Sequence, residues 1–192
     1  GLLSVISAIS ISLILAIVLF KWESRQKNPL FDFSILKNVH ITLSLISGFL
    51  ATLVLTGSIF LIPFFFELVM GYSTDFSGLI ILLPSLAVIF IGPLSGYISE
   101  EWDLAFHPIV SLIIAAILLT FLNETIGLLF IFIALGIRAL SEGMFTPANN
   151  KLIMSHSTPE KLGSVSSLLN TARYLGLVMG VVIFNTIFNY TI

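Results

Sequence analysis

The feature that most constrains the fold is a succession of long apolar stretches. A helix of about 20 mainly apolar residues is long enough to cross the hydrocarbon core of a bilayer. Only 9% of the 192 residues are charged, against about 25% in a typical soluble domain. The sequence therefore predicts an all-α, polytopic transmembrane helix bundle. The six predicted spans are 2–20, about 41–70, 76–98, 108–122, 127–145 and 162–188.

Charge and cysteine content exclude several classes of function. The formal net charge is -2 and no run of five basic residues occurs, so we expect no nucleic-acid partner. The absence of cysteine excludes disulfides and thiolate chemistry. His40, His107 and His156 have no second ligand at metal-binding spacing, and no phosphate loop or serine-nucleophile motif occurs. We expect no metal, no cofactor and no enzymatic activity.

The lysines and arginines of the connecting segments predict the orientation. Two of the eight basic residues lie inside predicted spans, and the other six lie in loops on one face of the membrane. By the positive-inside rule, loops 21–40, 99–107 and 147–161 are cytoplasmic. We expect a multi-pass protein of the plasma (cell inner) membrane.

Three ionisable residues lie inside the predicted spans. Arg138 and Glu142 are one helical turn apart, and Arg173 lies about 16 Å into the last span at 1.5 Å per residue. Each charge costs about 2.5 to 3.5 kcal/mol at the bilayer centre, so we expect these residues to face the bundle interior and pair. Glu142 can pair with Arg138, with Arg173 or with both. The cluster is either a structural link between the fifth and sixth helices or the lining of a substrate or proton path.

A stripe of small and polar residues runs along the last span. At about 100° per residue, its members fall within an arc of about 140°. They are Gly163, Ser166, Asn170, Arg173, Gly176 and Gly180. Gly163, Gly176 and Gly180 are predicted packing residues, because small side chains let helix backbones approach. Asn170 and Arg173 are candidate path residues. Just before this span, Thr158 is the predicted N-cap and Pro159 the first helical residue.

Three other features each leave two interpretations. Glu67, near the outer end of the second span, either reaches the membrane surface or lines an outer vestibule. Pro63, which we expect to break the second span, and Pro84 and Pro93 are either packing kinks or hinges. The segment 21–40 is either an ordinary linker or includes a short amphipathic piece on the membrane surface.

Three stretches, spread over most of the chain, resemble segments of a known protein family. The first comprises NPLFDFSILKN, LIPFFFELVMGYS and FSGLIILLP; the second is GPLSGYISEEWD; the third is STPEKLGSVSSLLNTARYLGLVMG. They resemble the linker and ninth-to-tenth helices, the cytoplasmic loop after the tenth helix, and the entry to the thirteenth helix of one family. That family is the drug:proton antiporter branch, with fourteen transmembrane helices, of the major facilitator superfamily. In the third and most specific stretch, the glycines, Asn170 and Arg173 stand at matching positions.

The resemblance implies a proton-coupled exporter of drugs or other small molecules that works by alternating access. Its partners would be a small-molecule substrate, protons, the lipid bilayer and a missing N-terminal half. The chain would then be a fragment containing helices eight to thirteen. Residues 1–20 would be a helix preceding the C-terminal bundle, 21–40 the cytoplasmic linker, and 41–192 five helices of that bundle. The alternatives are a specific metabolite transporter of another branch, and a non-transporting membrane scaffold or truncated remnant.

The chain departs from this family at three places. The cytoplasmic loop motif, with Gly96, Glu100 and Glu101, lacks the basic residue that the family has after an acidic one. Glu67 stands where the family commonly has glutamine. Arg138 and Glu142 stand in a segment that is usually small and glycine-rich. The family's proton-coupling acidic residues lie mainly in the N-terminal half, so none is assigned here.

Overall fold

The computed structural model describes residues 33–98 and 127–191, together with a few isolated positions elsewhere. These residues form helices, and no strand occurs among them, so the predicted all-α fold is confirmed. Beyond isolated positions, the predicted first and fourth spans lie outside the described residues, as do His107, Glu100 and Glu101. The elements are the 3₁₀ helix η1 (Phe33–Lys37), α2 (Val39–Phe64), the π-helix η2 (Phe65–Val69), α3 (Thr74–Ile98), α5 (Leu128–Ser155), the 3₁₀ helix η3 (Pro159–Lys161) and α6 (Leu162–Thr191).

Among the described residues, three helical segments are long and apolar enough to cross a membrane. They are Val39–Val69, Leu128–Ser155 and Pro159–Tyr190. α3 is a further long helix of 25 residues. Large apolar side chains such as Leu43 and Val178 are exposed on the outer faces of α2 and α6. Apolar surface of this extent is suited to lipid rather than water, so the chain is an integral membrane protein.

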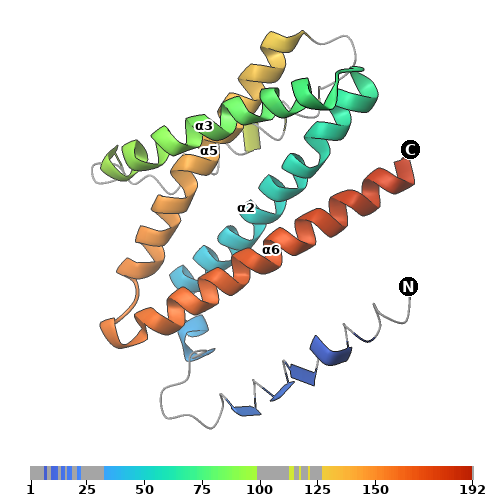
Figure 1. Cartoon of the computed structure of the whole chain (residues 1–192). Helices are drawn as coiled ribbons and strands as arrows, with labels where there is room; N and C mark the ends of the chain where they lie inside the picture. The colour runs from blue at the N-terminus through green and yellow to red at the C-terminus, as the bar shows by residue number, and fades with distance from the viewer. Residues whose placement is uncertain are drawn as a thin grey trace.

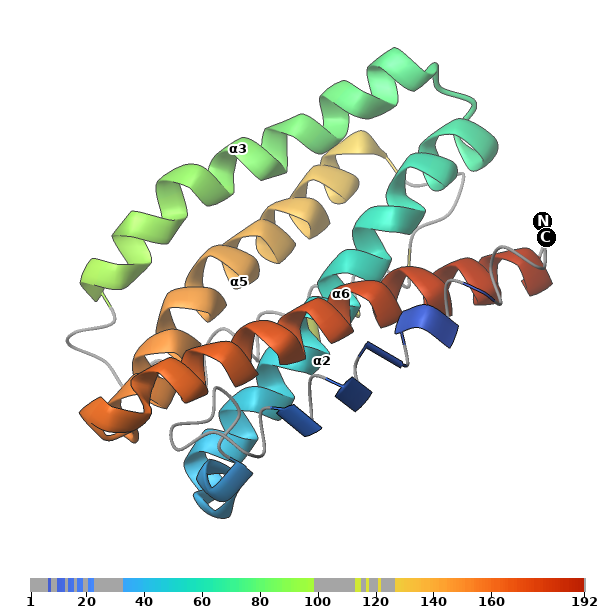
Figure 2. The same cartoon turned by 60° about the horizontal axis from the view of Figure 1, so that its bottom comes forward.

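The helices form two closely packed pairs, which are joined mainly through contacts between α2 and α5. α2 packs along α6, and α3 packs against α5 (Figure 1). α5 also contacts α2. Figure 2 shows α3 beside α5, and α6 crossing α2. α6 touches α5 only sparsely. Any polar residue of α5 that needs a partner on another helix must therefore find it mainly on α2 or α3.

Two glycines of α6 set the distance between α6 and α2. A Cβ atom added at Gly180 would lie 2.5 Å from the carbonyl oxygen of Leu53. A Cβ at Gly176 would overlap the carbonyl oxygen of Phe49. Both obstacles are backbone atoms, which cannot rotate away as a side chain can. The two helices can be this close only because these positions have no side chain.

Two apolar clusters close the bundle at its ends. At one end, Ile35 of η1 packs with residues from the starts of α2 and α6 and the end of α5. At the other end, Phe66 of η2, which is fully buried, packs with residues of α2, α3 and α5. Polar side chains of the interior lie between these clusters, and they form the candidate site described below.

α5 is longer than the sequence predicts. It continues through Pro147 to Ser155, so residues 147–155 are helical and are not part of a loop. The prediction ended the helix too early because proline and two asparagines are typical of turns. Here both asparagines have hydrogen-bond partners inside the bundle, Asn149 on α2 and Asn150 on α6. These partners replace the solvent that a loop would require.

The helix is also continuous through Pro63, where the sequence predicts a break. The chain changes to a π-helix directly after this proline, and the N–H of Met70 donates to the carbonyl oxygen of Phe65 at 3.1 Å. Gly71 then ends the element with a φ of 67°, a left-handed conformation that favours glycine. A wider turn is one way for a transmembrane helix to accommodate proline.

The start of α6 follows the sequence prediction. Thr158 occupies the N-cap position and Pro159 is the first residue of η3, which leads directly into α6. The Thr158 side chain makes no capping hydrogen bond to the backbone. The helix start therefore depends on the fixed φ of proline more than on a side-chain cap.

Replacing Gly180 with alanine should separate α2 from α6. The new methyl group meets a backbone carbonyl, and overpacking of this kind costs about 1 to 3 kcal/mol. We expect a lower free energy of unfolding, measured in mixed micelles of detergent and denaturant. The matched control is Gly163→Ala, because a Cβ at Gly163 meets no atom within 4 Å. Equal stability of the two variants would contradict the close approach described here.

Candidate functional site

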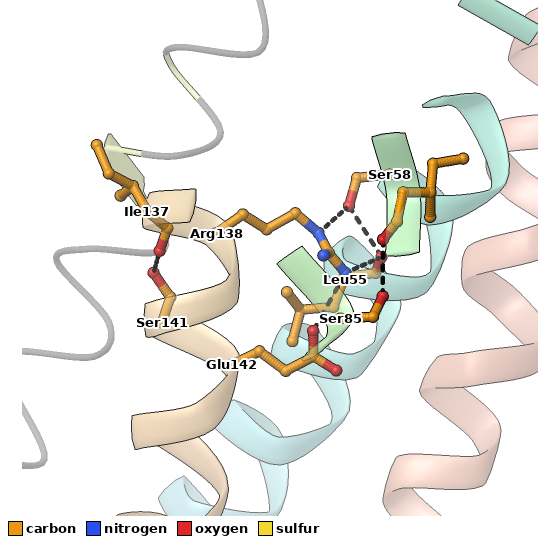
Figure 3. Close-up of polar contacts among 8 residues, drawn as sticks. Leu55, Ser58, Ser85, Ile137, Arg138, Ser141 and Glu142 are labelled. Atoms are coloured by element: carbon orange, nitrogen blue, oxygen red, sulfur yellow. Dashed lines mark hydrogen bonds and ion pairs between the residues drawn. The ribbon is translucent and has the colours of Figure 1, made fainter. Parts of the chain in front are cut away.

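The first polar cluster is centred on Arg138, which extends from α5 toward α2 (Figure 3). Its Nη2 lies 3.2 Å from Oε2 of Glu142, one turn further along α5. Its Nε donates to the Ser58 hydroxyl at 3.2 Å, and Nη2 also lies 3.4 Å from the carbonyl oxygen of Leu55. The guanidinium thus bridges a carboxylate of its own helix and polar atoms of α2.

The two members of this ion pair differ in exposure. The Arg138 side chain is only 7% exposed, whereas that of Glu142 is 34% exposed. A buried guanidinium without a counter-charge is strongly destabilising, so Arg138 depends on the Glu142 carboxylate and on the α2 acceptors. Glu142 lies at the edge of the bundle, where other groups can reach its carboxylate. The pair therefore combines a fixed cation with an accessible acid.

A second polar cluster joins α2, α5 and α6. The Asn149 side chain donates to the carbonyl oxygen of Ser44 at 3.2 Å and accepts from the Ser47 hydroxyl at 3.2 Å. Arg173 of α6 donates to Oδ1 of Asn150 at 2.8 Å. Adjacent asparagines of one helix thus contact two different neighbours, which fixes the end of α5 between α2 and α6.

The two clusters are separate. Arg138 and Asn150 are twelve residues apart in α5, which corresponds to about 18 Å along the helix. The structure therefore pairs Glu142 with Arg138, while Arg173 contacts Asn150 instead. The Arg138–Glu142 pair contacts α2 rather than α6, so it does not form the predicted link between the fifth and sixth helices.

The remaining predicted site residues lie outside both clusters. Asn170 is exposed on α6, and Glu67 is half-buried in η2 without a hydrogen bond in the described part of the chain. Gly163 lies in open space near the start of α6. Gly96 is in the last turn of α3. Within the residues that the structure describes, no group of three His, Cys, Asp or Glu side chains could hold a metal ion.

Sequence reasoning missed Asn149, Asn150 and Ser44. The signal for the asparagines was present, because two adjacent amides follow a long apolar stretch, but Pro147 led to a loop assignment. Ser44 is 1% exposed, and its hydroxyl has no partner among the described residues, although its carbonyl oxygen accepts from Asn149. No pattern in the sequence distinguishes this serine from others that bond back to their own helix.

Comparison with known proteins identifies the family. The model of the Major Facilitator Superfamily matches residues 2–181, which include both polar clusters and all the described helices except the end of α6. The chain belongs to this superfamily. No solved structure matches it at a significant level.

The relatives within the superfamily are transport and resistance proteins of bacteria. The chain is 26% identical to the riboflavin transporter RibZ of Clostridioides difficile over 95% of its own length and 40% of that protein. It is 25% identical to the multidrug export protein EmrB of Haemophilus influenzae, over 92% of this chain and 35% of that protein. It is 29% identical to the methylenomycin A resistance protein of Bacillus subtilis, over 88% of this chain and 38% of that protein. The chain thus spans about 40% or less of the length of these relatives.

The Arg138–Glu142 pair should be energetically coupled. Glu142→Gln leaves a buried guanidinium without its counter-charge, whereas the double variant with Arg138→Gln removes both charges. We expect a coupling energy of about 0.5 to 3 kcal/mol in a double-mutant cycle of unfolding free energies. In the corresponding cycle of Glu142→Gln with Arg173→Gln, the changes in unfolding free energy should be additive. Equal coupling in both cycles would contradict the separation of the two clusters.

The cluster around Asn149 should tolerate loss of the Ser44 hydroxyl but not loss of the Asn149 amide. Asn149→Ala removes two hydrogen bonds between α5 and α2, to the Ser44 carbonyl oxygen and from the Ser47 hydroxyl, and should lower the unfolding free energy by about 1 to 3 kcal/mol. Ser44→Ala removes an unpartnered hydroxyl and should leave stability unchanged or raised. Thermal unfolding of the two variants in detergent tests this order. A larger loss for Ser44→Ala would show that its hydroxyl has a partner in the folded protein.

Proposed function

We propose that the chain is part of a secondary active transporter that exports drugs or other small molecules in exchange for protons. Membership of the Major Facilitator Superfamily supports transport, and relatives named as multidrug export and resistance proteins support export. In the antiporter branch that the sequence resembles, the described helices would belong to helices eight to thirteen of fourteen. The N-terminal half of the transporter would supply the facing bundle, and no chemical conversion of the substrate is involved.

The observation that carries this proposal is the Arg138–Glu142 pair inside the bundle. A carboxylate that is partly accessible and held by a buried guanidinium can take up a proton when the pair opens. Protonation of Glu142 would remove the charge that holds Arg138, leaving the α2 contacts at Ser58 and Leu55 as its partners. Proton binding would thus be linked to the packing of α5 against α2, which is the kind of coupling that alternating access needs.

The other candidate residues have supporting roles in this proposal. Asn170 and Arg173 would contribute polar groups to the path on the α6 side, and the small-residue stripe would let α6 move against its neighbours. Glu67, in the π-helix, would line the outer vestibule. Loops 21–40, 99–107 and 147–161 would face the cytoplasm, with residues 147–155 as a helical extension, in a plasma membrane.

A second candidate function is transport of a specific metabolite. The relative named as a riboflavin transporter favours it, because that protein covers nearly the whole of this chain. The two candidates differ in substrate range and share the same membrane fold. A non-transporting scaffold is the third possibility, and measurement of flux separates it from both.

Replacement of Glu142 should impair proton coupling. We expect the full-length protein in proteoliposomes to move a fluorescent cationic dye in response to an imposed pH gradient, and Glu142→Gln to abolish this response. Dye binding should persist in the variant, because the side chain keeps its size. Transport by wild type without any gradient dependence would overturn the antiport mechanism, and absence of transport for every dye and metabolite tested would favour the scaffold.

The matched control is Glu160→Gln. Glu160 is an exposed carboxylate in η3, and neutralising it removes the same charge without touching the bundle interior. We expect its flux to equal that of wild type. An equal loss in both variants would mean that Glu142 has no special part in coupling.

A further inference from the structure

A cavity lies at one end of the bundle. It has a volume of about 420 Å³ and is bounded by η1, the start of α2, the turn after α5, η3 and the start of α6. Its lining residues come from two stretches far apart in sequence. They are Ser34, Ile35, Lys37, Asn38, Ile41, His156, Ser157, Thr158, Lys161 and Val165.

The cavity combines an apolar floor with a basic, polar rim. Ile35, Ile41 and Val165 are buried and belong to the apolar cluster at this end of the bundle. Lys37 of η1 and Lys161 of η3 supply two positive charges. No Asp or Glu is among the described lining residues. Such a site suits an anion that carries an apolar portion.

The rim is held together by hydrogen bonds between the two stretches. Lys161 Nζ donates to the Ser34 hydroxyl at 2.8 Å. The Asn38 side chain accepts from the backbone N–H of His40 at 3.0 Å, and its Nδ2 lies 3.4 Å from the carbonyl oxygen of His156. The rings of His40 and His156 stack with centroids 4.4 Å apart. Lys161 is therefore positioned by a hydrogen bond that joins the two stretches.

The position of the cavity relative to the membrane narrows the choice of ligand. The three candidate spans begin or end around it, at Val39, Ser155 and Pro159. This is the level at which lipid headgroups lie. The distribution of basic residues predicts that this end faces the cytoplasm, where the leaflet carries anionic lipids that attract lysine and arginine.

We propose that this cavity binds the phosphate headgroup of an anionic lipid from the cytoplasmic leaflet. Lys37 and Lys161 neutralise the phosphate. The apolar floor receives the first methylenes of an acyl chain. A lipid bound in this way would connect the linker before α2 to the turn between α5 and α6. This role does not depend on what the protein transports.

The proposal predicts loss of lipid binding when the two lysines are neutralised together. Each basic residue near a membrane surface is worth about a five-fold change in affinity, so Lys37→Gln with Lys161→Gln should weaken binding about thirty-fold. The measurement is native mass spectrometry of the full-length protein, purified in mild detergent and titrated with short-chain phosphatidylglycerol. Phosphatidylcholine, which has no net charge, should bind much more weakly than phosphatidylglycerol.

Two control variants separate binding from structure and from general charge. Lys151→Gln removes a positive charge at the same end of α5 but outside the cavity, and should bind phosphatidylglycerol as wild type does. Ser34→Ala breaks the hydrogen bond to Lys161 but keeps both charges, so it should retain binding within a few-fold. If the double variant binds as tightly as Lys151→Gln, the proposal is wrong.

Inorganic phosphate distinguishes the lipid from a soluble anion. Lipid binding predicts that millimolar phosphate neither raises the unfolding temperature of wild type nor displaces phosphatidylglycerol. If phosphate does both, and the double variant abolishes both effects, the cavity is a site for a soluble phosphate and the lipid assignment is overturned.

Discussion

The backbone carbonyl oxygens of α2 hold this bundle together. Those of Ser44 and Leu55 accept hydrogen bonds from the Asn149 and Arg138 side chains of α5. Two others, on the turns between them, lie directly against glycines of α6. A helical carbonyl accepts one backbone N–H and has a second lone pair for a side-chain donor. At Ser44 and Leu55, the hydroxyls of Ser47 and Ser58 donate to the same oxygens as the α5 side chains. α2 thus serves as the shared element for both neighbours, which explains why α5 and α6 need little contact with each other.

The sequence predicts features that depend on residues close together in the chain better than it predicts contacts between helices. The all-α class, the start of α6 and the closeness of Arg138 to Glu142 follow from composition, from Thr158-Pro159 and from a four-residue spacing. The partner of Arg173 does not follow, because the sequence gives its depth in a helix but not which helix faces it at that depth. Pro147 misled the prediction for a related reason: its effect on a helix depends on whether nearby polar groups find partners in the bundle.

The two polar clusters differ in what they can do. In the Arg138 cluster, both charges lie on α5, so they move together and only the contacts with α2 can be made or broken between helices. In the Asn149 cluster, three helices are tied by uncharged amides and a single arginine. The first is the cluster that our proposal links to protonation, whereas the second joins three helices at the end near the basic cavity.

The π-helix after Pro63 allows the residues that follow it to rotate relative to α2. A π turn holds about one residue more than an α turn. Its conversion to an α-helical turn would rotate everything beyond it by roughly 100°, the angular step of one residue. Glu67 lies inside this segment. Its carboxylate could therefore be turned from one side of the helix to another while the part of α2 before Pro63, with its contacts to α5 and α6, stays where it is.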